Sequence, residues 1–194
     1  MVALIEGVKR GEIPDSQVVL VISDKPEAAG LKKAKDLGIA TMVIERRGRS
    51  REDHDAELIA ELHSKNVELV CLAGYMRLLS KDFIHAFENR IVNIHPSLLP
   101  SFPGLNVQQQ AIDHGVKISG CTVHFVNEDL DAGPIILQRA VEVKDADTAD
   151  TLAARILEQE HGAYVEAVRR IAGGEIALGT KTAISGESSG FGSN

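Results

Sequence analysis

Short apolar runs that alternate with helical segments constrain the fold of this chain more than any other feature of its sequence. The runs are rich in β-branched residues and lie at residues 18–22, 39–44, 69–73 and 90–95. Continuous runs of this kind are typical of strands that are buried on both faces of a parallel sheet. Strands that alternate with helices through short connections predict an α/β fold with a doubly wound, mostly parallel sheet.

The segments around these runs carry helix signals. Helices are predicted at residues 1–9, 30–37, 50–65, 81–87, 107–114 and 148–172. Ser50, followed three residues later by Asp53, marks one helix start, and Gly38 marks a helix end. We expect His54 and His63 on the surface of the helix that begins at Ser50.

The pattern changes after residue 115. Residues 119–126 and 135–143 are strand-like runs with no obvious helix between them, so they are expected to pair antiparallel at the C-terminal edge of one mixed sheet. A chain of 194 residues is long enough for one well-buried domain. We therefore expect residues 1–194 to form a single domain in which residues 175–194 are a Gly/Ser-rich tail.

Composition argues against several classes of function. A net charge of −7 argues against nucleic acid, and no apolar run approaches the roughly 18 residues of a membrane span. Cys71 and Cys121 lie in apolar runs, where a small buried thiol is the default interpretation, and no secretory signal peptide is seen, which fits the cytoplasm. His and Cys do not occur at metal-ligand spacings with a matching second pair, so no metal is predicted.

The strand at residues 90–95 delivers an amide and an imidazole into a loop that contains three prolines. Asn93 and His95 are two positions apart, so they point to the same face of a strand and can act on a single atom. The simpler interpretation is that both side chains cap the loop backbone. An Asp on the acidic loop at residues 127–131 could pair with His95, which favours a catalytic interpretation.

Two motifs resemble those of the glycinamide ribonucleotide formyltransferases. They read Asn-Ile-His-Pro-Ser-Leu-Leu-Pro at residues 93–100 and Leu-Asp-Ala-Gly-Pro at residues 130–134. The resemblance implies a Rossmann-like formyltransferase fold and transfer of a formyl group from 10-formyltetrahydrofolate to the amine of 5'-phosphoribosylglycinamide. It also implies that Asn93 and His95 donate to the developing oxyanion, that His95 is the general acid, and that Asp131 supports the imidazolium.

The same resemblance implies where the two ligands bind. The folate would contact Arg51 and two loops, formed by Met76, Arg77, Leu78 and Leu79 and by Asn127, Glu128, Asp129, Leu130 and Asp131. Glu160 would bind the ribose hydroxyls of the substrate, although its position in a helix also fits an exposed carboxylate. Packing or supporting roles are expected for Tyr75, His124 and His161.

The termini depart from the family pattern. Members of the family begin with a strand and a Gly-rich turn ending in Gly-Ser-Asn that holds the substrate phosphate at a helix start. This sequence instead ends in Gly192, Ser193 and Asn194, which are predicted to supply that phosphate loop next to Met1. The alternative is that these residues form only a Gly/Ser tail.

Other functions fit the same motifs. Water could replace the amine, which would make the protein a formyltetrahydrofolate hydrolase, and loss of the phosphate loop would leave a non-catalytic folate-binding module. A methionyl-tRNA formyltransferase is disfavoured because it needs a basic C-terminal domain. The expected partners are small molecules, and the oligomeric state stays open, with a homodimer as one alternative.

Overall fold

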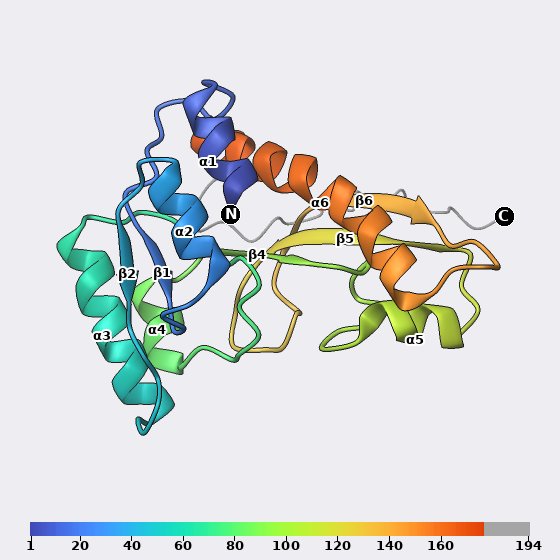
Figure 1. Cartoon of the computed structure of the whole chain (residues 1–194), viewed down its shortest axis with the longest axis horizontal. Coiled ribbons are helices and arrows are strands. Elements are labelled where there is room, and N and C mark those ends of the chain that lie inside the picture. Colours follow the sequence, from blue (N-terminus) through green and yellow to red (C-terminus); the bar gives the residue numbers. More distant parts are fainter. Residues whose placement is uncertain (177–194) are drawn as a thin grey trace, which may run out of the picture.

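The computed structural model describes residues 1–176, in which six helices alternate with six strands (Figure 1). In chain order the elements are α1 (Val2–Lys9), β1 (Val21–Ser23), α2 (Ala29–Asp36), β2 (Thr41–Val43), α3 (Arg51–Ser64), β3 (Val70–Cys71), α4 (Lys81–Ala86), β4 (Ile91–His95), α5 (Val107–Asp113), β5 (Ile118–Phe125), β6 (Ile135–Glu142) and α6 (Ala149–Ala172). All six predicted helices are confirmed, as is the α/β fold class.

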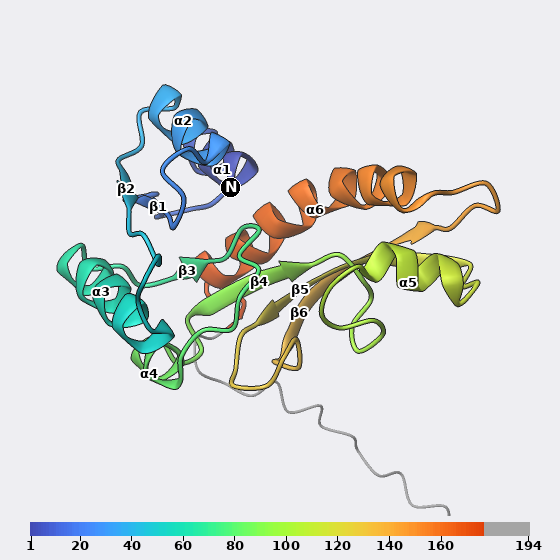
Figure 2. The ribbon, with the colours of Figure 1, turned by 60° about the horizontal axis from the view of Figure 1, so that its bottom comes forward.

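The strands form two sheets rather than the one that we expected. β1 pairs with β2 in parallel, and β3 pairs with β4 in parallel, but β4–β5 and β5–β6 are antiparallel, which confirms the predicted C-terminal edge. Figure 2 shows β1 and β2 on the side that carries α2, with β3 at the edge of the larger sheet. The two sheets stay separate because, within residues 1–176, no strand hydrogen-bonds to both β1 and β3.

Helix boundaries follow the capping signals closely, whereas strand boundaries do not follow the apolar runs. Ser50 Oγ accepts a hydrogen bond from the Asp53 N–H at 3.0 Å, which is the predicted helix start. By contrast, β1 begins at Val21 although its apolar run begins three residues earlier. A strand needs a ladder partner, and β2 pairs only with Val21–Ser23.

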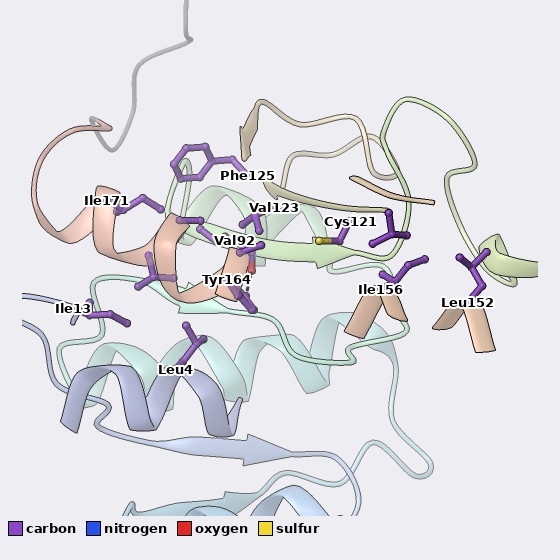
Figure 3. Close-up of a cluster of buried hydrophobic side chains, with 14 of the residues drawn as sticks. Leu4, Ile13, Val92, Cys121, Val123, Phe125, Leu152, Ile156, Tyr164 and Ile171 are labelled. Atoms are coloured by element: carbon purple, nitrogen blue, oxygen red, sulfur yellow. Dashed lines mark hydrogen bonds between the residues drawn. The ribbon is translucent and has the colours of Figure 1, made fainter. Parts of the chain in front are cut away.

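The main hydrophobic core lies between α6 and one face of β4 and β5 (Figure 3). Val92, Val123 and Phe125 face this core, and Ile156 and Tyr164 of α6 cover them. Each fully buried aliphatic or aromatic side chain of this kind contributes roughly 1.5–3 kcal/mol. This core uses alternate residues of β4, so the residues between them point to the opposite face of the sheet.

A second core joins α3 and α4 to the start of β4, and it corrects one prediction. His54 is only 2% exposed, so its predicted surface position is wrong, whereas His63 is exposed as expected. Burial of His54 is compatible with its polarity because its Nε2 donates to the Ile44 carbonyl at 2.9 Å and its Nδ1 lies 3.3 Å from Asp55. The other Asp55 oxygen accepts from the Ser80 N–H at 2.6 Å, which ties α3 to the start of α4.

Both cysteines are free, and burial raises the pKa of each thiol to about 11. Cys71 and Cys121 therefore stay protonated at neutral pH and act as small apolar side chains, as predicted. Within the part of the chain that the structure describes, no helix is both long and apolar enough to cross a bilayer.

Candidate active site

Asn93 and His95 lie on the face of β4 that α6 does not cover. They alternate with Val92 and Ile94, which pack toward the main core. In the antiparallel register Asn93 is directly opposite His124 of β5, and directly opposite residues on one face of such a pair bring their side chains together. Strand geometry thus places an amide and two imidazoles on one surface.

His124 is buried at 2% exposure and holds the amide of Asn93. Its Nδ1 donates to the Phe125 carbonyl at 2.9 Å, and its Nε2 lies 3.3 Å from Asn93 Nδ2. Burial lowers the pKa of His124 below its ordinary value, despite the opposing attraction of Asp131. A neutral ring protonated on Nδ1 leaves a lone pair on Nε2, so His124 accepts from Asn93 and fixes the rotation of its amide.

Asp131 lies between the two imidazoles. One of its oxygens lies 3.5 Å from His95 Nδ1 and accepts from the Gly104 N–H at 2.9 Å. The other oxygen lies 3.8 Å from His124 Nε2. Asp131 has a φ of +50°, a conformation that Asp and Asn adopt more readily than other non-glycine residues, and this turns the side chain back onto the strand. The predicted proximity of an acidic-loop Asp to His95 is confirmed.

The loop after β4 is held by side-chain hydrogen bonds as well as by its prolines. His95 Nε2 donates to the Phe102 carbonyl at 2.9 Å, and Ser97 Oγ donates to the Ser101 carbonyl at 2.6 Å. Thr122 Oγ1 donates to the Ser97 carbonyl at 2.7 Å and accepts from the Leu99 N–H at 3.0 Å. Both ring nitrogens of His95 therefore face an oxygen, and the ring has a fixed orientation at 5% residue exposure.

The loop after β3, predicted to contact the folate, divides into exposed and buried residues. Met76 and Leu78 are 71% and 55% exposed, whereas Leu79 is 8% exposed and belongs to the second core. Leu79 can therefore reach a ligand only through its backbone. Arg77 donates from Nη2 to Asp24, which links this loop to the end of β1.

Of the predicted residues in the second loop, only Asp131 reaches the catalytic pair. Asn127 Oδ1 accepts from the Asp129 N–H at 3.2 Å and shapes the turn. Glu128 instead lies 2.9 Å from Lys81 Nζ and 3.2 Å from His85 Nε2, both on α4. Leu130 is 55% exposed beside Gly104.

The remaining predicted residues lie elsewhere. Arg51 is exposed, with its Nε 3.2 Å from Glu52. Glu160 is half-buried rather than fully exposed, and burial raises its pKa although the Met1 amino group partly opposes the shift. His161 is exposed and lines a surface cavity against α1, so a packing role for it is wrong. Gly192, Ser193 and Asn194 lie outside the described residues, as does most of the tail.

Within residues 1–176, no group of three or more His, Cys, Asp or Glu side chains is arranged to hold a metal ion. The polar groups that converge are instead one amide, one carboxylate and two imidazoles, carried by Asn93, Asp131, His95 and His124. An amide and an imidazole that point to one place can donate to a single oxygen, and a nearby carboxylate can stabilise positive charge on the imidazole. The arrangement suits transfer of an acyl-type group through a tetrahedral intermediate.

Fold and site together define an α/β domain that carries a group-transfer centre on one face of a mixed sheet. A comparison with protein families matches residues 1–168 to the family described as "Formyl transferase". The chain belongs to this formyl transferase family. The phosphoribosylglycinamide formyltransferase of Escherichia coli is 41% identical over 177 residues, covering 91% of this chain and 83% of that protein.

Two further relatives extend the comparison. The crystal structure of glycinamide ribonucleotide transformylase 1 from Symbiobacterium toebii has a TM-score of 0.88 and 49% sequence identity, covering 91% of this chain and 84% of that chain. The trifunctional purine biosynthetic protein adenosine-3 of Gallus gallus is 47% identical over 165 residues, covering 84% of this chain. This chain spans only 16% of the length of that trifunctional protein.

Proposed function

We propose that this chain transfers the formyl group of 10-formyltetrahydrofolate to the amine of 5'-phosphoribosylglycinamide, a step of de novo purine biosynthesis in the cytoplasm. The observation that carries the proposal is the convergence of Asn93, His95 and Asp131 on one face of β4, with His95 Nδ1 3.5 Å from Asp131. The names of the bacterial relatives support the choice of acceptor.

The reaction begins when the acceptor amine attacks the formyl carbon. The new C–N bond converts the formyl oxygen into an oxyanion, and Asn93 and His95 donate to it. In the free protein the His95 Nε2 proton is shared with the Phe102 carbonyl. An oxyanion is a stronger acceptor than a neutral carbonyl, so this donor acts most strongly where charge develops.

Collapse of the intermediate breaks the bond between the formyl carbon and N10 of the folate. The attacking nitrogen loses a proton and N10 gains one, with His95 as general acid and Asp131 as the group that stabilises its imidazolium and relays protons through solvent. His124 does not need to change its protonation state. Its part is to hold the amide of Asn93 in the donating orientation.

The two substrates are assigned to opposite sides of this centre. The folate ring lies against backbone groups of the loops at residues 76–79 and 127–131, with Arg51 as a further contact. Glu160 accepts hydrogen bonds from the ribose hydroxyls, and its half-burial supports a ligand role because an unpaired carboxylate is costly to bury. Gly192, Ser193 and Asn194 remain the candidates for the phosphate loop.

A formyl-transfer assay with 5'-phosphoribosylglycinamide or water as acceptor tests the proposal. We expect transfer to the amine to dominate, whereas release of formate alone would establish the hydrolase alternative. His95→Ala and Asn93→Ala should each lower kcat by about 10²–10³-fold while folate binding changes little. His63→Ala, an exposed histidine on α3, is the control. A near-normal rate in either site variant would refute the assignment.

A further inference from the structure

A cationic surface cavity lies beside the loop after β3. Its volume is about 470 Å³, and its walls come from the end of β1, the segment after β2 and Arg77. Five lining side chains are cationic, namely Lys25, Arg46, Arg47, Arg49 and Arg77, whereas only Asp24 and Glu45 are acidic. The whole chain carries a net charge of −7, so this concentration of positive charge is local.

The positive charge of the cavity is only partly neutralised. Arg77 pairs with Asp24, and Arg49 pairs with Glu57 of α3. Lys25, Arg46 and Arg47 form no salt bridge with any of the described residues 1–176. Three cations thus remain available to an anionic ligand.

Arg77 supplies an independent sign that a ligand is missing. Its Nη1 is buried and has no hydrogen-bond partner among the described residues, although its Nη2 donates to Asp24. A buried donor without an acceptor is uncommon and costs roughly 1–3 kcal/mol, so such an atom indicates an acceptor that is not part of the described chain. Arg77 also belongs to the loop assigned to the folate, which makes the cavity continuous with that binding site.

We propose that this cavity binds the polyglutamate tail of the folate co-substrate through Lys25, Arg46, Arg47 and Arg77. The proposal rests on the proposed function, since it assigns the tail of the same formyl donor. Each added glutamate brings one carboxylate, and guanidinium groups bind carboxylates with two parallel hydrogen bonds. A row of arginines at the mouth of the folate site therefore selects long, multiply charged tails over the single glutamate of the shortest form.

The test compares two forms of the formyl donor, one with a single glutamate and one with five. The wild-type enzyme should have the higher kcat/KM for the pentaglutamate, and its advantage should shrink as salt is added. In the double variant Arg46→Gln/Arg47→Gln, the ratio of the two kcat/KM values should fall about three- to tenfold, because each exposed charge pair contributes modestly.

A matched control separates the cavity from net charge. Lys32→Gln/Lys35→Gln removes the same two charges from the exposed face of α2, outside the cavity, and should leave the ratio as in wild type. An unchanged ratio in the Arg46/Arg47 variant, or an equal loss with both donors, would overturn the proposal. A rise in KM for the phosphate-bearing acceptor alone would also overturn it, because the cavity would then serve a phosphate.

Failure of the proposed function gives a different result. In that case no formyl transfer is seen with either donor, and calorimetric titration with the two folates replaces the kinetic ratio. The tail site stands if the pentaglutamate binds more tightly to wild type than to Arg46→Gln/Arg47→Gln. Equal binding by both proteins rejects it.

Discussion

Asp131→Asn isolates the charge of the carboxylate that faces His95. Asn has nearly the same shape, tolerates the φ of +50° and keeps an oxygen that can accept from the Gly104 N–H. What it loses is the attraction between the carboxylate and an imidazolium 3.5 Å away. With an effective dielectric constant of about 20, Coulomb's law gives this pair about 5 kcal/mol.

Part of that attraction survives in the variant because the amide dipole and the Phe102 carbonyl still face the ring. We therefore expect a transition-state loss of about 3–4 kcal/mol, which corresponds to a fall in kcat of about 10²–10³-fold. Steady-state formyl transfer should be measured from pH 5 to 9. The deficit should be larger at high pH, because the variant holds less of the imidazolium form there.

Asp15→Asn is the matched control, since Asp15 is exposed and also has a positive φ, of 46°. It should retain the wild-type rate and pH profile. If Asp131→Asn lowers kcat by the same factor at every pH, Asp131 only positions the ring and the electrostatic role is refuted. If kcat is unchanged, Asp131 has no part in the reaction.

Three further changes test the scaffold around the site. Tyr164→Phe removes a buried hydroxyl that donates to two strand carbonyls at 2.8 and 2.9 Å, so the free energy of unfolding should fall by about 1–2 kcal/mol in urea titration, whereas Tyr75→Phe should change little. Gly133→Ala places a methyl group against a β5 carbonyl, so it should cost about 1–3 kcal/mol and lower kcat by moving the Asp131 loop, while Gly30→Ala, which has space, should be neutral or stabilising. Glu160→Gln should raise stability at pH 7, because burial raises the pKa of Glu160 and its ionised form is therefore unfavourable in the folded state. That gain should vanish as the pH falls toward the ordinary pKa of 4.5, and the KM for 5'-phosphoribosylglycinamide should rise; a gain that persists at low pH, or an unchanged KM, would contradict the ligand role.

The sequence predicted the helices better than the sheet because helix signals are local. Ser50 caps its helix through a residue three positions away, and both groups belong to one short segment. Strand extent depends instead on a distant partner, which is why β1 is confined to Val21–Ser23 and why the split into two sheets could not be predicted. Burial of His54 likewise depends on acceptors supplied by Ile44 and Asp55.

The candidate site was predictable to the extent that it follows from alternation along one strand. Asn93 and His95 share a face because they are two residues apart, and this needs no knowledge of the fold. The contact between His124 and Asn93 requires the β4–β5 register, which places residues 31 positions apart opposite one another. The turn of Glu128 toward α4 depends on Lys81 and His85, and no sequence spacing indicates it.

The antiparallel pairing of β5 has a chemical consequence for this centre. It sets His124 opposite Asn93, and the connection that leaves β5 can then return over the same face, where Asp131 meets His95. Because β5 also turns Val123 and Phe125 toward α6, the polar face is backed by a rigid apolar one. A donor held against such a layer undergoes little reorganisation when charge appears, which is the condition under which a neutral amide stabilises an oxyanion strongly.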